Sequence, residues 1–300
     1  MAFGQGQTSN EGVSIKRFIG VAACNVLGVN PNKAALEKIY GTTLEKEPEY
    51  IGEVEINGKK IKQVRIDFIV KPDSEKYLDS SNKPVDFTSK VAIFVRNSYR
   101  YNKDNTKVQV IDKYGRTAWV TIEQAKTNEI PIYSNGPANI DKDYRPAYIG
   151  EEELVNFIKT YLGIPSVDKW ADGKIVGKID NPEDAEARLD NISKYFEGDF
   201  SELSTIINYQ PNNKIKILFG VKNTEDGKTY QSTYNRMFLR SFVSDYNRLE
   251  KSRLEKNVKQ AQESGAFSTT EFEFTDLHEY TVKTTDFTTP SENNADALPW

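Results

Sequence analysis

The chain has 300 residues, 37% of them hydrophobic and 28% charged, which is enough to bury a sizeable core. No apolar run approaches the roughly 20 residues of a membrane helix, and the polar, glycine-rich start does not resemble a signal peptide. We therefore expect a cytoplasmic protein with no membrane partner. With one cysteine, Cys24, and one histidine, His278, the sequence predicts no metal, no cofactor and no histidine-dependent hydrolase site.

The first half of the chain predicts antiparallel β-structure. Residues 1–12 are expected to be disordered and 13–29 to form one or two strands. A short helix should follow, capped by Asn30, with Pro31 in its first turn and Gly41 at its end. Further strands are predicted at 50–70, as a hairpin around Asn57-Gly58, and at 91–95, 107–112 and 117–120. Short strands joined by turns indicate an antiparallel sheet or small barrel.

The second half predicts helices and then a return to strands. Residues 133–148 have the composition of a loop, and helices are expected at 151–162, 182–196 and 201–207. A late hairpin is predicted over 214–221 and 229–239, followed by an amphipathic helix over 240–262. The sequence therefore predicts an α+β fold whose body, residues 13–262, is a β-core with a helical insertion around 150–210.

Residues 263–300 form an acidic arm. The arm has eight acidic residues and one lysine, a net charge of -7, so the chain's total of -4 leaves +3 for residues 1–262. We expect the arm to be disordered, apart from a possible strand within 272–280. Its last residues predict a tail that inserts into a pocket on another protein: Asp296, Leu298, Pro299 and Trp300. The charge asymmetry favours nucleic acid as a partner of the body, and a purely solubilising tail is the alternative.

One group of candidate nucleic-acid-binding residues lies at and after the strand 91–95. Aromatic and basic side chains alternate there: Arg96, Tyr99, Arg100, Tyr101, Tyr114, Arg116 and Trp119. Bases of a single strand stack on aromatic faces while basic side chains contact the phosphates. Phe94 is expected to lie in the core. The alternative for the rest of the group is that Trp119 is also a core residue and that the arginines are solvated without binding a ligand.

A second group occupies even-numbered positions of the late hairpin, namely Lys228, Tyr230, Tyr234, Arg236 and Arg240. In a regular strand these positions project from one face. A face of alternating aromatic and basic residues is unusual for a core, so it predicts a nucleic-acid surface. An exposed ladder, with tyrosines packed against long side chains, is the alternative.

The residues Asp296-Ala297-Leu298-Pro299-Trp300 resemble the tip of single-stranded DNA-binding proteins, whose bacterial members end in acids, a hydrophobic residue, proline and phenylalanine. The stretch 229–236 is similar to a late strand of the bacteriophage members. The resemblance implies an antiparallel β-barrel of the oligonucleotide-binding (OB) type, elaborated with helices. It further implies non-catalytic, sequence-tolerant binding of single-stranded DNA in phage replication or recombination. The tail would recruit replication or recombination proteins, and copies of the chain would associate with one another along DNA. Both would take place in the host cytoplasm.

Two other classes remain open on sequence alone. A phage structural or assembly protein without DNA binding would also account for the modest charge of the body. A carboxylate-dependent enzyme would need clustered acids at strand ends, where the predicted strands offer only Asp67 and Asp112. We therefore expect a protein that is not an enzyme.

Overall fold

The fold is that of a computed structural model, which describes residues 15–56, 58–72, 87–128, 140–162, 167–171, 174–179, 187–209, 211, 213–223, 229–240 and 277–282. For residues 15–21, 167–171, 174–179, 216, 218, 220–223, 229–232, 234–240 and 277–282 the backbone is described and the side chains are not. In these ranges no helix is long and apolar enough to cross a membrane.

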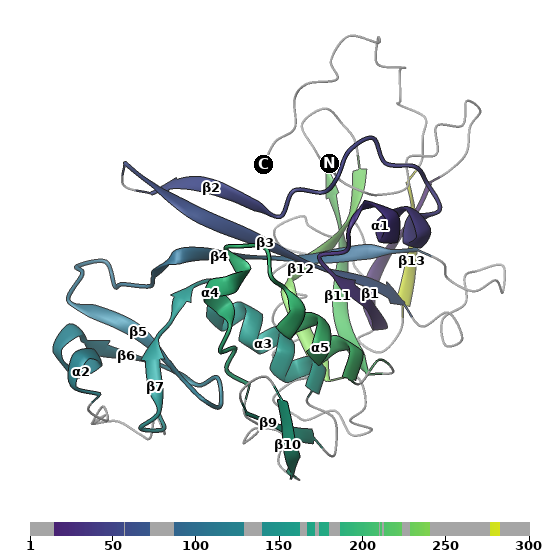
Figure 1. The fold of residues 1–300 in the computed structure, drawn as a ribbon. Coiled ribbons are helices and arrows are strands. Elements are labelled where there is room, and N and C mark those ends of the chain that lie inside the picture. Colours follow the sequence, from purple (N-terminus) through teal and green to yellow (C-terminus); the bar gives the residue numbers. More distant parts are fainter. Residues whose placement is uncertain are drawn as a thin grey trace.

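A curled antiparallel sheet forms the centre of the molecule (Figure 1). The strand order is β12-β11-β1-β3-β4-β8, with β2 paired to β3 and β13 paired to β1. The strands are β1 (Ile15–Val29), β2 (Ile51–Ile56), β3 (Lys59–Pro72), β4 (Ser89–Tyr99), β8 (Tyr148–Ile149), β11 (Lys214–Asn223), β12 (Thr229–Arg240) and β13 (Leu277–Val282). The curl brings Cα atoms of β12 within 8 Å of β4, so the sheet forms a half-barrel.

A smaller sheet continues from the end of β4. Its order is β6-β5-β7, with β5 (Lys107–Asp112), β6 (Thr117–Thr121) and β7 (Tyr144–Pro146), and α2 (Ile122–Thr127) follows β6. Backbone hydrogen bonds join the two sheets, because Arg100 N donates to Ala147 O (3.0 Å) and Gln109 N donates to Arg100 O (2.8 Å). A pair of strands, β9 (Val167–Ala171) and β10 (Lys174–Ile179), forms a separate hairpin.

Helices cover one face of the central sheet (Figure 1). They are α3 (Glu151–Leu162), α4 (Ile192–Tyr195) and α5 (Ser201–Tyr209), while α1 (Lys33–Tyr40) connects β1 to β2. Along β3 the residues Val64, Ile66 and Phe68 point to the helices, and the Phe68 ring stacks 3.9 Å from that of Phe157 on α3. This period-two alternation against an amphipathic helix builds the main core.

The predicted strands and the helices 151–162 and 201–207 are confirmed. The predicted hairpin is present as β2 and β3. Ile56 pairs with Lys59, which leaves two residues for the turn, and Gly58 adopts φ 75°. Residues 13–29 give one strand from Ile15 onward. The strand Leu277–Val282 overlaps the strand predicted within the acidic arm and pairs with Ile15–Gly20 of β1.

Three predictions about local structure are wrong. The cap of α1 is Asn32, whose side chain accepts from Ala35 N (2.9 Å), whereas Asn30, at φ 41°, bonds the backbone of Asp67 on β3. Of 182–196, the described residues 187–191 are not helical and the helix is limited to Ile192–Tyr195. The expected loop 133–148 contains β7 and the start of β8. In each case a tertiary contact overrides local propensity.

Of the helix predicted over 240–262, Arg240 belongs to β12 instead and residues 241–262 lie outside the described residues. Residues 1–12, predicted to be disordered, and the chain tip 283–300 also lie outside them. The helices around 150–210 do follow the first β-region and precede β11, and β11 rejoins the same sheet beside β1. One sheet is thus assembled from both halves of the sequence.

Candidate nucleic-acid interface

The end of β4 carries the first exposed aromatic residues of the site. Ile93 and Val95 are buried under the helices, and the intervening Phe94 is exposed on the opposite face, so its predicted place in the core is wrong. The pairing with β8 is irregular between Arg96 and Tyr99. Beyond this irregularity Tyr99 is 41% exposed.

Tyr99 belongs to a row of aromatic rings. Its ring centroid lies 5.2 Å from that of Tyr148 on β8, which in turn lies 5.6 Å from that of Phe196 after α4. Burial raises the pKa of Tyr148, as do its neighbour Tyr99 and Glu151, against the lowering influence of Arg145. The row gives Tyr99 a supported position while leaving much of its surface open to a ligand.

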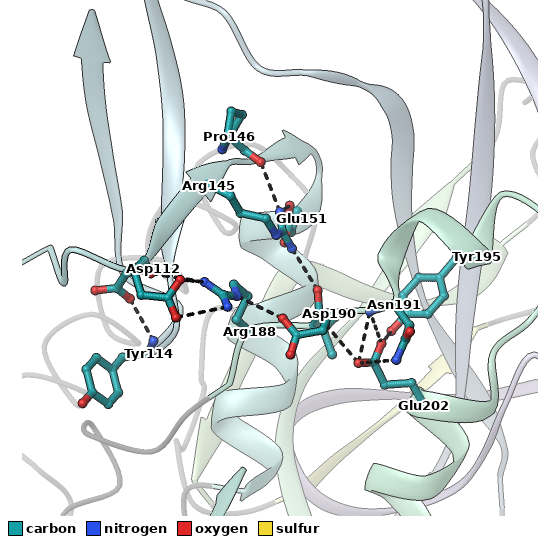
Figure 2. A network of polar contacts seen from close by, with 12 residues as sticks. Asp112, Tyr114, Arg145, Pro146, Glu151, Arg188, Asp190, Asn191, Tyr195 and Glu202 are labelled. Atoms are coloured by element: carbon teal, nitrogen blue, oxygen red, sulfur yellow. Dashed lines mark hydrogen bonds and ion pairs between the residues drawn. The ribbon is translucent and has the colours of Figure 1, made fainter. Parts of the chain in front are cut away.

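An ion pair joins Arg145 to Glu151, the first residue of α3 (Figure 2). Arg145 on β7 donates to both carboxylate oxygens of the fully buried Glu151 (2.9 and 2.5 Å) and to the carbonyl of Leu189 (2.8 Å). Glu151 Oε2 also accepts from Tyr148 N (2.9 Å). The guanidinium carbon of Arg145 lies 6.0 Å from the centre of the Tyr148 ring. Arg145 therefore positions Tyr148 at the start of α3.

Trp119 presents a second aromatic surface on the small sheet. It lies opposite Gln109 in the β5–β6 register and is 36% exposed, so it is not a core residue. The Arg100 guanidinium carbon lies 5.8 Å from the centre of its ring. Arg100 also forms an ion pair with Glu152 (2.9 Å). Its contacts thus join Trp119 to the first turn of α3.

Tyr101 and Arg96 flank these surfaces. Tyr101 forms an isolated bridge to Val108 of β5 and is 44% exposed. Arg96 donates from Nε to Gln63 Oε1 on β3 (2.9 Å), which is a neutral partner. Both residues lie close in sequence to the point where the chain passes from the central sheet into the small sheet.

Tyr114 and Arg116 are tied to the β5–β6 turn. The buried Asp112 accepts from Tyr114 N, Arg116 N and Arg116 Nε at 2.8–2.9 Å, and the Arg116 guanidinium carbon lies 4.8 Å from the Tyr114 ring centre. Asp112 is therefore engaged in holding the turn. The other predicted isolated carboxylate, Asp67, is buried between Arg65 and Lys90 (3.1 Å each) and has a similar structural role.

Further polar contacts connect this region to α5 (Figure 2). Arg188 forms ion pairs with Asp143 (2.9 Å) and Asp190 (3.1 Å). The hydrogen bond that Arg188 donates to Asp143 lowers the pKa of that carboxyl group. Glu202 accepts from the backbone of Asn191 and from the Tyr195 hydroxyl. Burial raises the pKa of Glu202 and that of Tyr195. We assign these contacts to stability, since they fix the segment between the helices.

Most of the second predicted group lies on β12, whose pairing with β11 is irregular. β12 forms as predicted, but Phe219 pairs with Thr233 whereas Ile217 pairs with Phe238, so β12 advances five residues while β11 advances two. The regular pairing with β11 is therefore interrupted between Tyr230 and Arg240. Because the side chains of Tyr230, Tyr234, Arg236 and Arg240 are not described, the one-face arrangement of the group stays a prediction. Tyr230, Tyr234, Arg236 and Arg240 are on β12, and Lys228 and the tail residues Asp296, Leu298, Pro299 and Trp300 lie outside the described residues.

The fold brings together residues that sequence reasoning treated separately. Arg100 and Trp119 meet across the small sheet, and Tyr99 meets Tyr148. Tyr148 and Arg145 were missed because 133–148 has the composition of a loop. A signal was present, since Tyr144, Arg145 and Tyr148 mix tyrosine and arginine as residues 99–101 do.

Comparison with known proteins adds no relative: no family model matches the chain, and neither a curated protein nor a solved structure matches it. The function is therefore inferred from the geometry of the surface itself. That geometry consists of exposed Tyr99, Tyr101 and Trp119, with Arg100 beside Trp119 and with Arg145 beside Tyr148, the neighbour of Tyr99.

Proposed function

We propose that the chain binds single-stranded DNA without catalysis and without sequence preference. The observation that carries this proposal is the exposure of Tyr99, Tyr101 and Trp119 at the junction of two antiparallel sheets, with Arg100 against Trp119. Single-strand-binding surfaces combine aromatic faces, which every base can stack on, with basic groups along the backbone path. The half-barrel supports an OB-like interpretation of the body, which is part of the proposal.

The two kinds of contact have separate tasks. Trp119 and Tyr99 offer π-faces to successive bases, and neither makes the base-edge hydrogen bonds that read sequence. Arg96 and Arg100 contact phosphates and release counterions, which makes the affinity dependent on salt. Duplex DNA keeps its bases stacked and paired, so it cannot use the aromatic surfaces. A preference for single strands follows.

The biological role that this chemistry suits is coating of single-stranded DNA during phage replication or recombination in the host cytoplasm. The acidic arm would then present Leu298, Pro299 and Trp300 to replication or recombination proteins, and copies of the chain would associate along DNA. The tail resemblance and the charge asymmetry of the sequence support this part of the proposal.

The binding proposal is tested by titrating fluorescent oligo-dT and a duplex of equal length at several salt concentrations. We expect tighter binding to oligo-dT, with log K falling linearly against log salt. Stacking on aromatic residues should leave a single-strand preference that persists as salt is raised. Equal affinity for the two DNAs, or no binding at low salt, would contradict the proposal.

The tail is tested by a truncation after Val282, which retains β13, whereas removal of the whole acidic arm would also take away a strand that pairs with β1. We expect the full chain to retain host replication proteins on an affinity column, and both the truncated chain and Trp300→Ala to lose them. The full-length variant Phe287→Ala, altered elsewhere in the same tail, serves as control and should still retain the host proteins. Retention by the truncated chain would exclude the tail as the recruiting element.

A second candidate is a phage structural or assembly protein without DNA affinity. It is favoured by the pairing of Arg100 with Glu152, Arg116 with Asp112 and Arg188 with Asp143, which neutralises much of the positive charge near the site. This candidate predicts stable ordered oligomers in light scattering and no signal in the DNA titration. The two measurements together separate the candidates.

A further inference from the structure

Three hydrogen-bond donors converge on the carboxylate of Glu152. Arg100 Nη1 lies 2.9 Å and Gln109 Nε2 3.0 Å from Oε2, and Thr117 Oγ1 lies 2.9 Å from Oε1. Arg100 directly follows β4, Gln109 lies on β5 and Thr117 on β6, while Glu152 comes from α3. Two strands and the residue that follows β4 therefore build one anion-binding position, and a carboxylate of the chain occupies it.

The position is preorganised by contacts among the donors. Gln109 is 4% exposed, and its Oε1 accepts from Arg100 Nη1 (3.2 Å), which directs its amide nitrogen towards the carboxylate. Backbone pairing fixes Gln109 beside Arg100 and opposite Trp119. An aromatic face and an anion-binding position therefore lie next to each other, joined by the 5.8 Å contact of Arg100 with the Trp119 ring.

We propose that Arg100, Gln109 and Thr117 form a subsite for a phosphate oxyanion of the DNA backbone, which Glu152 occupies in the free protein. This inference rests on the proposed function and names the backbone contact next to Trp119. A carboxylate and a phosphodiester both present two acceptor oxygens to an arginine, so one can replace the other. The phosphate takes the donors, and the base beside it stacks on Trp119.

The exposure of the ion pair permits this exchange. The side chains of Arg100 and Glu152 are 46% and 37% exposed, and ion pairs open to solvent contribute little to stability. After displacement Glu152 remains in the first turn of α3, where the helix dipole favours its negative charge. Glu152 thereby weakens binding of any anion that cannot also use Trp119.

The decisive variants are Glu152→Gln and Glu153→Gln, which remove the same charge from adjacent positions of one helical turn. In oligo-dT titrations we expect Glu152→Gln to bind about fivefold more tightly than wild type, because the competing charge is lost. Its salt dependence should steepen by about one unit of slope, because in wild type the displaced Glu152 carboxylate takes up a cation that offsets one released from the DNA, and the variant lacks this carboxylate. Glu153→Gln should change neither quantity beyond a small effect of net charge. Equal tightening in the two variants would overturn the subsite.

A second measurement uses inorganic phosphate and does not require DNA. We expect phosphate to raise the melting temperature of Glu152→Gln and of Glu152→Ala relative to chloride at equal ionic strength, and to do so more than for wild type. Adding Arg100→Gln should remove the difference. Absence of phosphate stabilisation in both Glu152 variants would overturn the subsite even if the chain binds DNA. If the chain does not bind oligo-dT but shows this stabilisation, the proposed function fails and the anion subsite stands.

Discussion

Replacing Trp119 with alanine is expected to weaken oligo-dT binding by about 5- to 150-fold, because stacking of one base on an aromatic side chain contributes about 1–3 kcal/mol. The slope of log K against log salt should not change, since an indole binds no counterion. This combination distinguishes loss of stacking from loss of a phosphate contact. Adding Tyr99→Ala should lower the affinity further, as the two rings contact different neighbours and act on different bases.

Tyr209 provides the matched control. It lies at the end of α5, is 50% exposed, and belongs to an element far from the small sheet (Figure 1). Tyr209→Ala should bind oligo-dT as wild type does. A comparable loss in this variant would mean that the Trp119 effect reflects general destabilisation.

Fluorescence gives a direct readout of the same contact. The chain has three tryptophans, so the variant Trp170→Phe/Trp300→Phe retains Trp119 as its single indole. Stacking of a base on Trp119 should quench its emission on titration with oligo-dT, and the duplex should quench it less. Unchanged emission at saturating oligo-dT would remove Trp119 from the interface.

Much of the β-structure follows from local sequence. The alternation in β3 and β4 and the Asn57-Gly58 turn specify a hairpin and its neighbours, because the buried face and the turn select the same register. The helix α3 follows equally from its acidic first turn and apolar stripe. These elements are predictable since each carries its own signal within a few residues.

The functional surface was less predictable because its contacts join distant residues. Arg100 meets Glu152 across 52 positions, and Arg145 meets Leu189 across 44. The sequence shows these charges without their partners, so it overestimates how many arginines are available to phosphate. In β12 the run of even-numbered positions contains a shift of register, which only the pairing with β11 defines.

Gly150→Ala is expected to prevent stable folding. Gly150 adopts φ 89°, and a Cβ there would lie 1.9 Å from the carbonyl oxygen of Phe94. An alanine in such a conformation costs about 1–2 kcal/mol, and the backbone clash must in addition separate β8 from β4. Since domains are stable by only about 5–15 kcal/mol, we expect insoluble protein or a melting temperature lowered by more than 10 °C.

Two other glycines separate the causes of that effect. Gly52 on β2 has open space around it and no positive φ, so Gly52→Ala should leave the melting temperature nearly unchanged. Gly58 combines φ 75° with open space, so Gly58→Ala should carry the conformational cost alone, about 1 kcal/mol. The ranking Gly52, Gly58, Gly150 in thermal denaturation thus tests whether β8 must contact β4 closely. That contact holds Tyr148 beside Tyr99, so a soluble Gly150→Ala protein should also bind oligo-dT more weakly. If the variant instead has the affinity and stability of wild type, the junction of β4 and β8 tolerates a side chain at this position.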